Sequence, residues 1–221
     1  MRQLLLNVLL RDDATFENFY AGKNQAVVDY LKNPQENLIY LYSKPHAGLT
    51  HILQALYRGH QSCLYIYPAL SPAILENLSQ LDLIIIDDIE NIADKPEWQE
   101  KLFNLYNQVM ANNKKLIIAG HVLPQNLDIK LLDLKSRLQA MLLLTLQELN
   151  DGEKIKALQS RAHARGLHLS DDVAQFLLNR APRDMAKLYE ILGHLDKHSL
   201  EENRRLTIPF VKKILYTEPF V

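Results

Sequence analysis

Short apolar runs and helical patterns alternate through the first two thirds of the chain. The apolar runs have the length of strands, and they span residues 38–43, 63–68, 81–87, 115–120 and 141–146. The third run, "LDLIIID", is apolar on both faces, which is typical of a buried parallel strand. Apolar residues recur at helical spacing between the runs, over 48–58, 71–78, 96–111 and around 131–138. Such alternation predicts an α/β fold with a five-stranded parallel sheet flanked by helices and joined by right-handed crossovers.

After about residue 146 the pattern becomes entirely helical. The segment "NDGEKIKALQSRAHARG" predicts a helix that ends at Gly166, and Ser170 is placed to cap the next helix. Two further helices are expected over 182–195 and 208–215. We therefore divide the chain into an α/β core and a small all-helical domain, with bounds 12–147 and 148–221, preceded by residues 1–11.

Composition and charge exclude several classes of protein. A formal charge of −1 provides no global basic field to hold nucleic acid. The single cysteine, Cys63, excludes an internal disulfide and favours a reducing compartment, and its place before an apolar run favours a buried structural thiol. No apolar run approaches the ~20 residues of a membrane helix, and the opening "MRQLLLNVLLRDD" has no signal cleavage site. We expect a cytoplasmic protein.

The segment after the first apolar run has the length of a phosphate-binding loop. Gly48 and Thr50 match the motif, while Ser43 replaces its first glycine. Leu49 stands where the phosphate-binding lysine belongs, and Pro45 removes a backbone donor. Backbone amides at the helix start could still hold a diphosphate, but efficient ATP hydrolysis is not expected.

Two acids follow the third apolar run, in "LIIIDDIE". Asp87 and Asp88 lie where an open α/β sheet binds ligands, and a Walker-B aspartate holds Mg²⁺ at that place. The alternative is a strand that ends in two solvated acids, but a loop of phosphate-binding length upstream favours the Walker-B interpretation. His121 follows the fourth run, either as a γ-phosphate sensor or as a surface or partner-contact residue. No histidine pair has zinc-ligand spacing with cysteine, so no metal site is expected.

Two arginines lie at positions of interest, although their spacing alone does not assign them a role. Arg137 in "DLKSRLQ" could be an arginine finger that reaches a neighbouring subunit's nucleotide, but by spacing alone an ordinary surface arginine is favoured. Arg183 begins a helix of the second domain, where a nucleotide-facing role and a solvated surface role are equally supported.

Several segments together resemble a known family. The stretch "DDATFENFYAGKNQAVV" (12–28) is similar to the N-terminal motif of the DnaA-type AAA+ initiator ATPases, and it contains Phe19 and Asn24. "IIIDDIE", "DLKSRL" and the helical segment from residue 151 extend the resemblance over nearly the whole chain. The end, "RRLTIPFVKKIL", resembles the Hda-type regulators of this family, and no helix-turn-helix domain for origin DNA is expected after it.

The resemblance implies an AAA+ core with a helical lid, in a regulator that is not an independent enzyme. Such regulators bind ATP-bound DnaA and the DNA-loaded sliding clamp, the beta subunit of DNA polymerase III, and promote hydrolysis of DnaA's ATP, which represses initiation of replication. Arg137 aligns with the finger offered in trans to DnaA's nucleotide, and Arg183 with the lid residue that senses the protein's own nucleotide. The nucleotide-binding positions implied are Phe19, Asn24, Gly48, Thr50, Asp87, Asp88 and Arg183.

The N-terminal "QLLLNV" resembles the family's clamp-binding peptide. Gln3 would donate or accept hydrogen bonds, and Leu4 and Leu6 would fill an apolar pocket of the clamp, whereas Asn7 replaces the usual proline. Since Leu49 removes the loop cation, ADP is expected to bind weakly or not at all, with no requirement for Mg²⁺. A weak self-contained ATPase and a DnaA-related adaptor that loads a partner at origins remain open as alternatives. A homodimer also remains open, while sequence-specific DNA binding and membrane binding are not expected.

Overall fold

The computed structural model describes residues 14–67, 70–76, 78 and 80–217 of the 221-residue chain. These residues form two compact units, of which the first ends at Gln147 and the second begins at Glu148.

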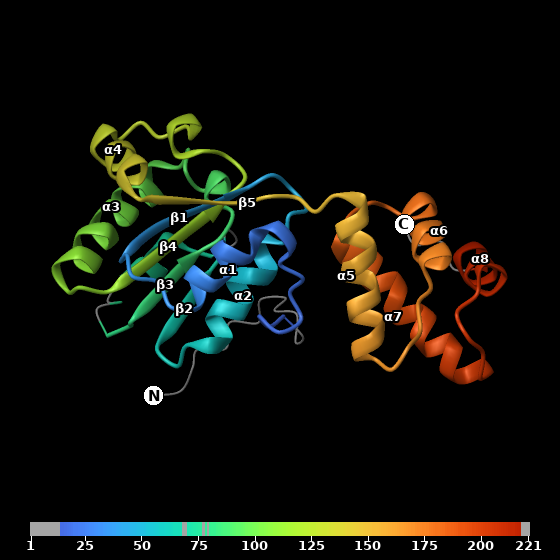
Figure 1. Cartoon of the computed structure of the whole chain (residues 1–221). Coiled ribbons are helices and arrows are strands. Elements are labelled where there is room, and N and C mark those ends of the chain that lie inside the picture. Colours follow the sequence, from blue (N-terminus) through green and yellow to red (C-terminus); the bar gives the residue numbers. More distant parts are fainter. Residues whose placement is uncertain (1–13, 68–69, 77, 79, 218–221) are drawn as a thin grey trace. The chain divides into compact units, whose positions relative to one another are not determined.

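The first unit is built on one parallel sheet of five strands. The strands are β1 (Leu38–Ser43), β2 (Cys63–Ile66), β3 (Leu83–Ile86), β4 (Lys115–Gly120) and β5 (Leu142–Leu146). Their order across the sheet is β2-β3-β4-β1-β5, with every neighbouring pair parallel (Figure 1). The parallel α/β sheet predicted from the apolar runs is confirmed.

Helices cover both faces of this sheet. Helices α1 (Gln25–Lys32) and α2 (Leu49–Gly59) lie on one face, and α3 (Pro96–Ala111) and α4 (Leu132–Ala140) lie on the other (Figure 1). Along β3, Leu83 and Ile85 face the cluster of α1 and α2, whereas Ile84 and Ile86 face that of α3 and α4. Because both faces of β3 are covered, its residues form an unbroken apolar run rather than an alternating one.

Four short 3₁₀ helices occur among the described residues, of which the first runs directly into α1 and the other three lie in connections. They are η1 (Gly22–Asn24), η2 (Pro72–Leu75), η3 (Ile89–Asn91) and η4 (Pro124–Asn126). The helix expected over 71–78 is therefore a single short turn. Ser71 accepts a hydrogen bond from the Ala73 backbone N–H, and Glu76 is already extended, with φ −90° and ψ 147°. The apolar spacing there suits a turn that packs on α3 as well as it suits a helix.

In the part of the second unit that the structure describes, residues 148–217, four helices surround a separate apolar core. They are α5 (Asp151–Ala164), α6 (Asp171–Arg180), α7 (Met185–Glu202) and α8 (Ile208–Thr217). Asn150 and Glu153 cap α5 reciprocally, and the chain turns after α5 through Gly166 with φ +75°. Ser170 precedes α6 as expected, but its side chain donates and accepts no capping hydrogen bond. No helix among the described residues is long and apolar enough to cross a membrane.

Helix α7 begins later and extends further than its sequence pattern predicts. Asp184 caps it by accepting a hydrogen bond from the Ala186 N–H, so the residues after Pro182 stay outside the helix. At the other end α7 continues from Leu195 to Glu202 and stops at Asn203, which is left-handed with φ 48°. The hydrophobic pattern does not predict the last turns of α7, because exposed polar residues outnumber apolar ones there.

Candidate functional site

The candidate site lies at the carboxyl ends of β1, β3 and β4. Strand β1 is hydrogen-bonded to β4, but its chain continues through α2 to β2 at the far edge of the sheet. The strand that follows β1 in the sequence is therefore not its neighbour in the sheet, which makes the carboxyl end of β1 a topological switch point. Open α/β sheets bind ligands at such points. His121 Nδ1 lies 2.9 Å from the backbone oxygen of Ser43, so the ends of β4 and β1 meet here.

The loop between β1 and α2 has the backbone of a phosphate-type turn. His46 and Gly48 both have positive φ angles, of 69° and 88°, and Gly48 is the residue before the first turn of α2. A Cβ at Gly48 would come within 2.8 Å of Phe19 Cε2, so the Phe19 ring lies directly against this loop. Phe19 also packs on His51 of α2, with ring centroids 5.3 Å apart. The backbone amides at the start of α2 are thus retained, together with the aromatic neighbour.

Leu49, at the position of the missing lysine, belongs to the hydrophobic core. Its side chain is only 2% exposed and packs in the same cluster as Ile52 and Leu53 of α2. An apolar side chain at this position contributes no cation to a phosphate. The loop therefore presents backbone donors without the ammonium group that a triphosphate requires.

Asp87 is buried and extensively hydrogen-bonded. Its Oδ2 accepts a 2.5 Å hydrogen bond from the Tyr65 hydroxyl, and its Oδ1 accepts from the Asp88 backbone N–H at 2.9 Å. Burial raises the pKa of the Asp87 carboxyl, while the hydrogen bonds from Tyr65, the Asp88 N–H and Thr50 act in the opposite direction. The contact between Asp87 and Thr50 is the pairing expected of a Walker-B acid and a loop hydroxyl. It also joins two of the predicted nucleotide-binding residues.

Replacing Asp87 by asparagine is expected to raise stability at neutral pH. Because burial raises the pKa of Asp87 in the folded state, the folded chain holds this proton more tightly than the unfolded chain does. The contribution of Asp87 to stability is therefore fully present only below the pKa of the unfolded chain, and it is lost as the pH rises from there through the higher folded pKa. Asp87→Asn should raise the free energy of unfolding at pH 7 and flatten its decline with pH, measured by urea denaturation between pH 4.5 and 8.

Asp82 provides a control because its substitution should change the free energy of unfolding in the opposite direction. Its pKa is lowered, first by the hydrogen bond from Lys114, so its charged form favours folding above the unfolded pKa. Asp82→Asn should therefore lower the free energy of unfolding at pH 7. A decrease for Asp87→Asn as well would show that its hydrogen bonds outweigh its burial.

Three further polar side chains meet beside Asp87. Asp88, Glu90 and His121 bring one carboxylate or imidazole ligand atom each within 4.8 Å of the others. Burial raises the pKa of Asp88, and the neighbouring carboxylates of Asp87 and Glu90 raise it further. The sequence spacing predicted no metal site, and these residues come together only because β3 and β4 are adjacent.

Asn24 is buried, and its side chain is hydrogen-bonded within the core unit. Its amide donates to the Gln147 backbone oxygen at 2.8 Å and accepts from the Gln147 N–H at 2.7 Å. These two bonds tie the start of α1 to the end of the core. Both polar ends of the amide are thereby used, and a nucleotide contact by Asn24 stays a prediction.

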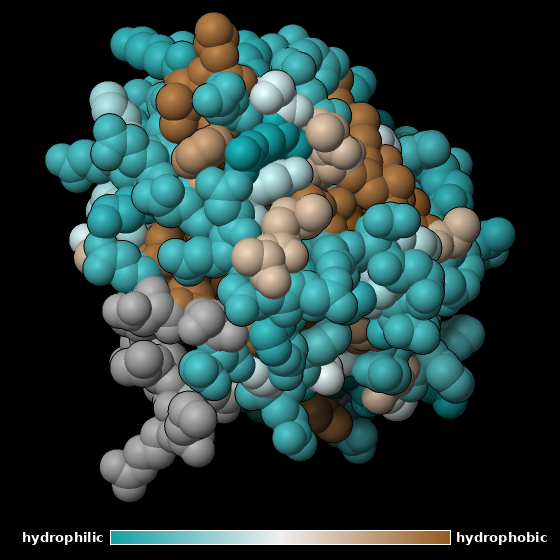
Figure 2. All heavy atoms as spheres, turned by 90° about the vertical axis from the view of Figure 1, so that its left-hand side faces the viewer, coloured by the Kyte–Doolittle hydropathy of each residue, from teal (hydrophilic) through white to brown (hydrophobic). Residues whose placement is uncertain are grey.

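Arg137 lies on α4 and stacks on aromatic rings of α3. Its guanidinium carbon lies 4.3 Å from the Phe103 ring centroid and 5.2 Å from that of Tyr106, and it donates a hydrogen bond to Asn107. Helices α3 and α4 lie on the side of the molecule shown in Figure 2, a mainly hydrophilic face with hydrophobic side chains among the polar ones. Stacking holds the half-buried Arg137 in a defined position near the surface.

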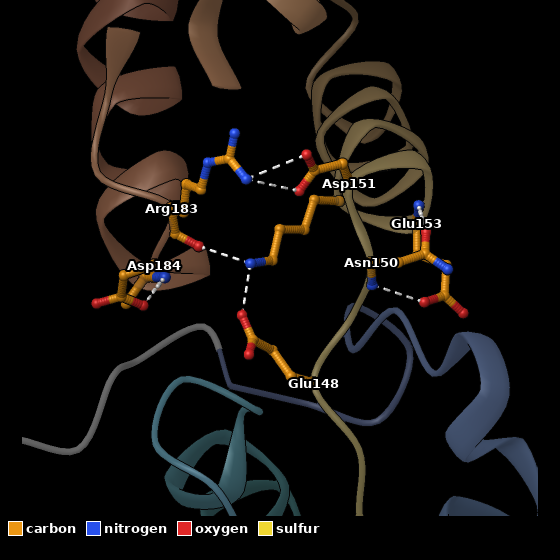
Figure 3. Close-up of polar contacts among 8 residues, drawn as sticks. Glu148, Asn150, Asp151, Glu153, Arg183 and Asp184 are labelled. Atoms are coloured by element: carbon orange, nitrogen blue, oxygen red, sulfur yellow. Dashed lines mark hydrogen bonds and ion pairs between the residues drawn. The ribbon is translucent and has the colours of Figure 1, made fainter. Parts of the chain in front are cut away.

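Arg183 forms an exposed ion pair within the helical unit. Its guanidinium lies 3.2 Å from Asp151 Oδ2, and its backbone oxygen accepts a hydrogen bond from Lys154 at 3.0 Å (Figure 3). Lys154 is nearly buried and also pairs with Glu148 at 2.6 Å. The segment before α7 is thereby tied to α5, and the nucleotide-sensing role of Arg183 stays a prediction.

Removing the Lys154 ammonium should destabilise the helical unit. Lys154→Met keeps most of the side-chain volume but leaves the Arg183 carbonyl without its donor, at an expected cost of about 1–3 kcal/mol. Chemical denaturation would measure this change. The control Lys187→Met, at an exposed pair with Glu190 in α7, should change stability by less than about 0.5 kcal/mol. Equal effects in the two variants would contradict a structural role for the buried ammonium.

Cys63 is a buried structural residue. Burial raises the pKa of its thiol to about 12, so the thiolate is not formed at neutral pH.

The clamp-binding residues Gln3, Leu4 and Leu6 lie outside the described residues. Two side chains of the site, Tyr65 and Glu90, were not predicted from the sequence. Tyr65 lies on β2 opposite Ile85, and only this strand pairing places its hydroxyl at Asp87. Glu90 could have been suspected because it follows Asp88 by two residues.

The fold and site define a class of protein. A parallel sheet in this order, a phosphate-type loop after β1, a buried acid after β3 and a separate helical unit are the parts of an AAA+ P-loop protein. Two families match the chain, "Hda, lid domain" over residues 151–215 and "Bacterial DnaA ATPase domain" over residues 71–148. The chain belongs to the Hda-like branch of the DnaA-homologous AAA+ proteins.

Similar proteins align over nearly the full length of this chain. An uncharacterized protein of Haemophilus influenzae is 40% identical, with 97% of this chain and 98% of that protein aligned. Domain III of the replication initiation protein DnaA from Thermotoga maritima has a TM-score of 0.77 at 20% identity, covering 95% of this chain and 98% of that one. AMPPCP-bound DnaA from Aquifex aeolicus has a TM-score of 0.71 at 22% identity, covering 85% of this chain but 66% of that one. At such identities these structures show the fold alone.

Proposed function

We propose that this protein represses initiation of DNA replication by promoting hydrolysis of the ATP bound to DnaA. Membership in the Hda-like family supports a DnaA-related regulator. The observation that carries the proposal is a contrast between two parts of the core. Its own loop has a buried leucine in place of the catalytic lysine, whereas Arg137 is held near the surface by two aromatic rings. In this proposal the chemistry is directed at a partner's nucleotide.

Arg137 would act in trans on DnaA. A guanidinium beside the γ-phosphate neutralises charge that develops during phosphoryl transfer and accelerates it by about 10³- to 10⁵-fold. The planar group also donates to two phosphate oxygens at once, which a lysine cannot do. Stacking on Phe103 and Tyr106 reduces the side-chain freedom that would be lost when the complex forms.

The protein's own nucleotide has a lesser role in this proposal. Gly48 and the amides at the start of α2 would hold the diphosphate, and Thr50 and Asp87 are paired beside them. Leu49 supplies no charge, so we propose that ADP binds weakly or not at all and that Mg²⁺ is not required. Arg183 would contact such a nucleotide from the helical unit. Hydrolysis by the protein alone should be negligible.

The sliding clamp would hold this regulator on DNA. In this proposal Gln3, Leu4 and Leu6 bind the beta subunit of DNA polymerase III as an extended peptide, and Asn7 in place of proline weakens the contact. Binding to a clamp already loaded on DNA would make the activity depend on the loaded clamp.

The test is hydrolysis of radiolabelled ATP by ATP-loaded DnaA, with and without this protein and the DNA-loaded clamp. We expect strong stimulation only when both are present, and no turnover by this protein with the clamp alone. A chain with Gln3→Ala and Leu6→Ala should lose both clamp binding and stimulation. Normal clamp binding without any stimulation would overturn the inactivator proposal, and turnover by this protein alone would instead support a self-contained ATPase.

A further inference from the structure

Asp88, Glu90 and His121, which lie beside the phosphate loop that lacks its lysine, are side chains of the types that bind metal ions. Asp88 and Glu90 follow β3, and His121 follows β4, the next strand in the sheet. One ligand atom from each lies within 4.8 Å of the other two. The three side chains enclose one point from two neighbouring loops, and none of them belongs to the phosphate loop itself.

The His121 ring is oriented by a backbone oxygen. Nδ1 lies 2.9 Å from the Ser43 carbonyl oxygen, which can only accept, so Nδ1 carries the hydrogen and donates it. In the neutral ring this leaves the lone pair on Nε2, which lies 4.0 Å from Asp88 Oδ1. A backbone carbonyl that receives the second ring N–H is the usual support of a metal-bound histidine.

Glu90 has one satisfied oxygen and one unsatisfied oxygen. Its Oε1 accepts a hydrogen bond from the His121 backbone N–H at 3.0 Å, which fixes the side chain. Its Oε2 is fully buried and has no hydrogen-bond partner among the residues that the structure describes. A buried carboxylate oxygen without a donor is costly, so a missing cation is a physical explanation for it.

Gly120 provides the space in which Glu90 adopts this position. A Cβ at residue 120 would come within 2.3 Å of Glu90 Oε2, so any other residue would displace the carboxylate. Asp88 adds a second carboxylate from a left-handed backbone conformation, with φ 46°. Three carboxylates, those of Asp87, Asp88 and Glu90, therefore crowd around one imidazole.

We propose that Asp88, Glu90 and His121 bind one divalent transition-metal ion of the Zn²⁺ type. Imidazole with carboxylates suits Zn²⁺ and its neighbours, whereas Mg²⁺ prefers oxygen ligands alone. In a tetrahedral Zn²⁺ site the ligand atoms lie about 3.4 Å apart, since Zn–N and Zn–O bonds are near 2.1 Å. Small side-chain rotations would close the cluster to that spacing, with water in the fourth position.

The bound ion would change both the charge and the rigidity of this end of the sheet. It would neutralise the excess carboxylate charge and tie the loop after β3 to the loop after β4. This inference does not depend on the action of the protein on DnaA, because binding can be measured with this chain alone.

The test is isothermal titration of the full-length, nucleotide-free protein with Zn²⁺ and, separately, with Mg²⁺. We expect one Zn²⁺ per chain, much weaker binding of Mg²⁺, and at least a tenfold loss of Zn²⁺ affinity in Glu90→Gln and in Asp88→Asn. Glu201→Gln is the matched control, since Glu201 pairs with His198 at 3.4 Å in α7 outside the cluster, and it should bind Zn²⁺ as the wild type does.

Two measurements distinguish loss of this metal site from misfolding of the variants, and specific Zn²⁺ binding from incidental binding elsewhere on the chain. Thermal denaturation should show Glu90→Gln to be no less stable than the wild type without metal, because the change neutralises a carboxylate whose Oε2 is buried without a hydrogen-bond donor among the described residues. X-ray absorption of the Zn²⁺-loaded chain should show one imidazole and no sulfur ligand. A sulfur ligand, no Zn²⁺ binding at all, or an affinity unchanged in both cluster variants would overturn the proposal.

Discussion

Arg137→Ala is expected to abolish the stimulation of DnaA's ATP hydrolysis while this protein stays folded. A trans-acting arginine contributes about 10³-fold or more to phosphoryl transfer, so the rate should fall to that of DnaA alone. The cost in stability should be small, about 0.5–1 kcal/mol, because the lost stacking on Phe103 and Tyr106 lies near the surface. The measurement is the hydrolysis assay described above, together with thermal denaturation of the variant.

Two further variants test whether the stimulation needs the arginine side chain at position 137 or only a positive charge. Arg137→Lys keeps the charge but loses the planar fork, and it should recover little of the stimulation. Arg180→Ala removes another arginine that lies over an aromatic ring, Phe176 in the helical unit at 5.9 Å, and it should stimulate as the wild type does. Full stimulation by Arg137→Ala would mean that another residue supplies the charge or that DnaA is activated by repositioning alone.

Leu49→Ala is expected to lower the free energy of unfolding by about 2–5 kcal/mol. The side chain is 2% exposed within the cluster beneath α2, and truncating a buried leucine loses transfer free energy and leaves a cavity. Urea denaturation at neutral pH would measure the loss. The same position in a nucleotide enzyme would hold a charged residue directed at phosphate, whose removal would affect turnover more than stability.

Leu132→Ala is the matched control for this change. Leu132 begins α4 and is 76% exposed, so its truncation should change stability by less than about 0.5 kcal/mol. A loss below about 1 kcal/mol for Leu49→Ala would show that Leu49 is not part of the core in solution. The phosphate loop would then be open to a cation supplied from elsewhere in the chain.

Local patterns were sufficient to predict most elements of both units. A strand that is covered on both faces can be recognised in the sequence as a short apolar run. The helix of 96–111 can be recognised because its core-facing residues recur at helical spacing and Pro96 lies in its first turn. The pattern was insufficient over 71–78, because a few apolar residues beside Pro72 suit a short 3₁₀ turn equally well. It also missed the end of α7, where few apolar residues remain.

The parallel α/β class, the helical C-terminal unit and the loss of the loop lysine at Leu49 could all be predicted from the amino-acid sequence. These features depend on local periodicity or on one residue at one position of a motif. The burial of Leu49 in the core, the hydrogen bond from Tyr65 to Asp87 and the shared site of Glu90 and His121 were visible only in the folded chain. The contacts of Tyr65, Glu90 and His121 depend on strand order. Residues far apart in the chain become neighbours through hydrogen bonding between β2, β3 and β4, and no local pattern encodes that order.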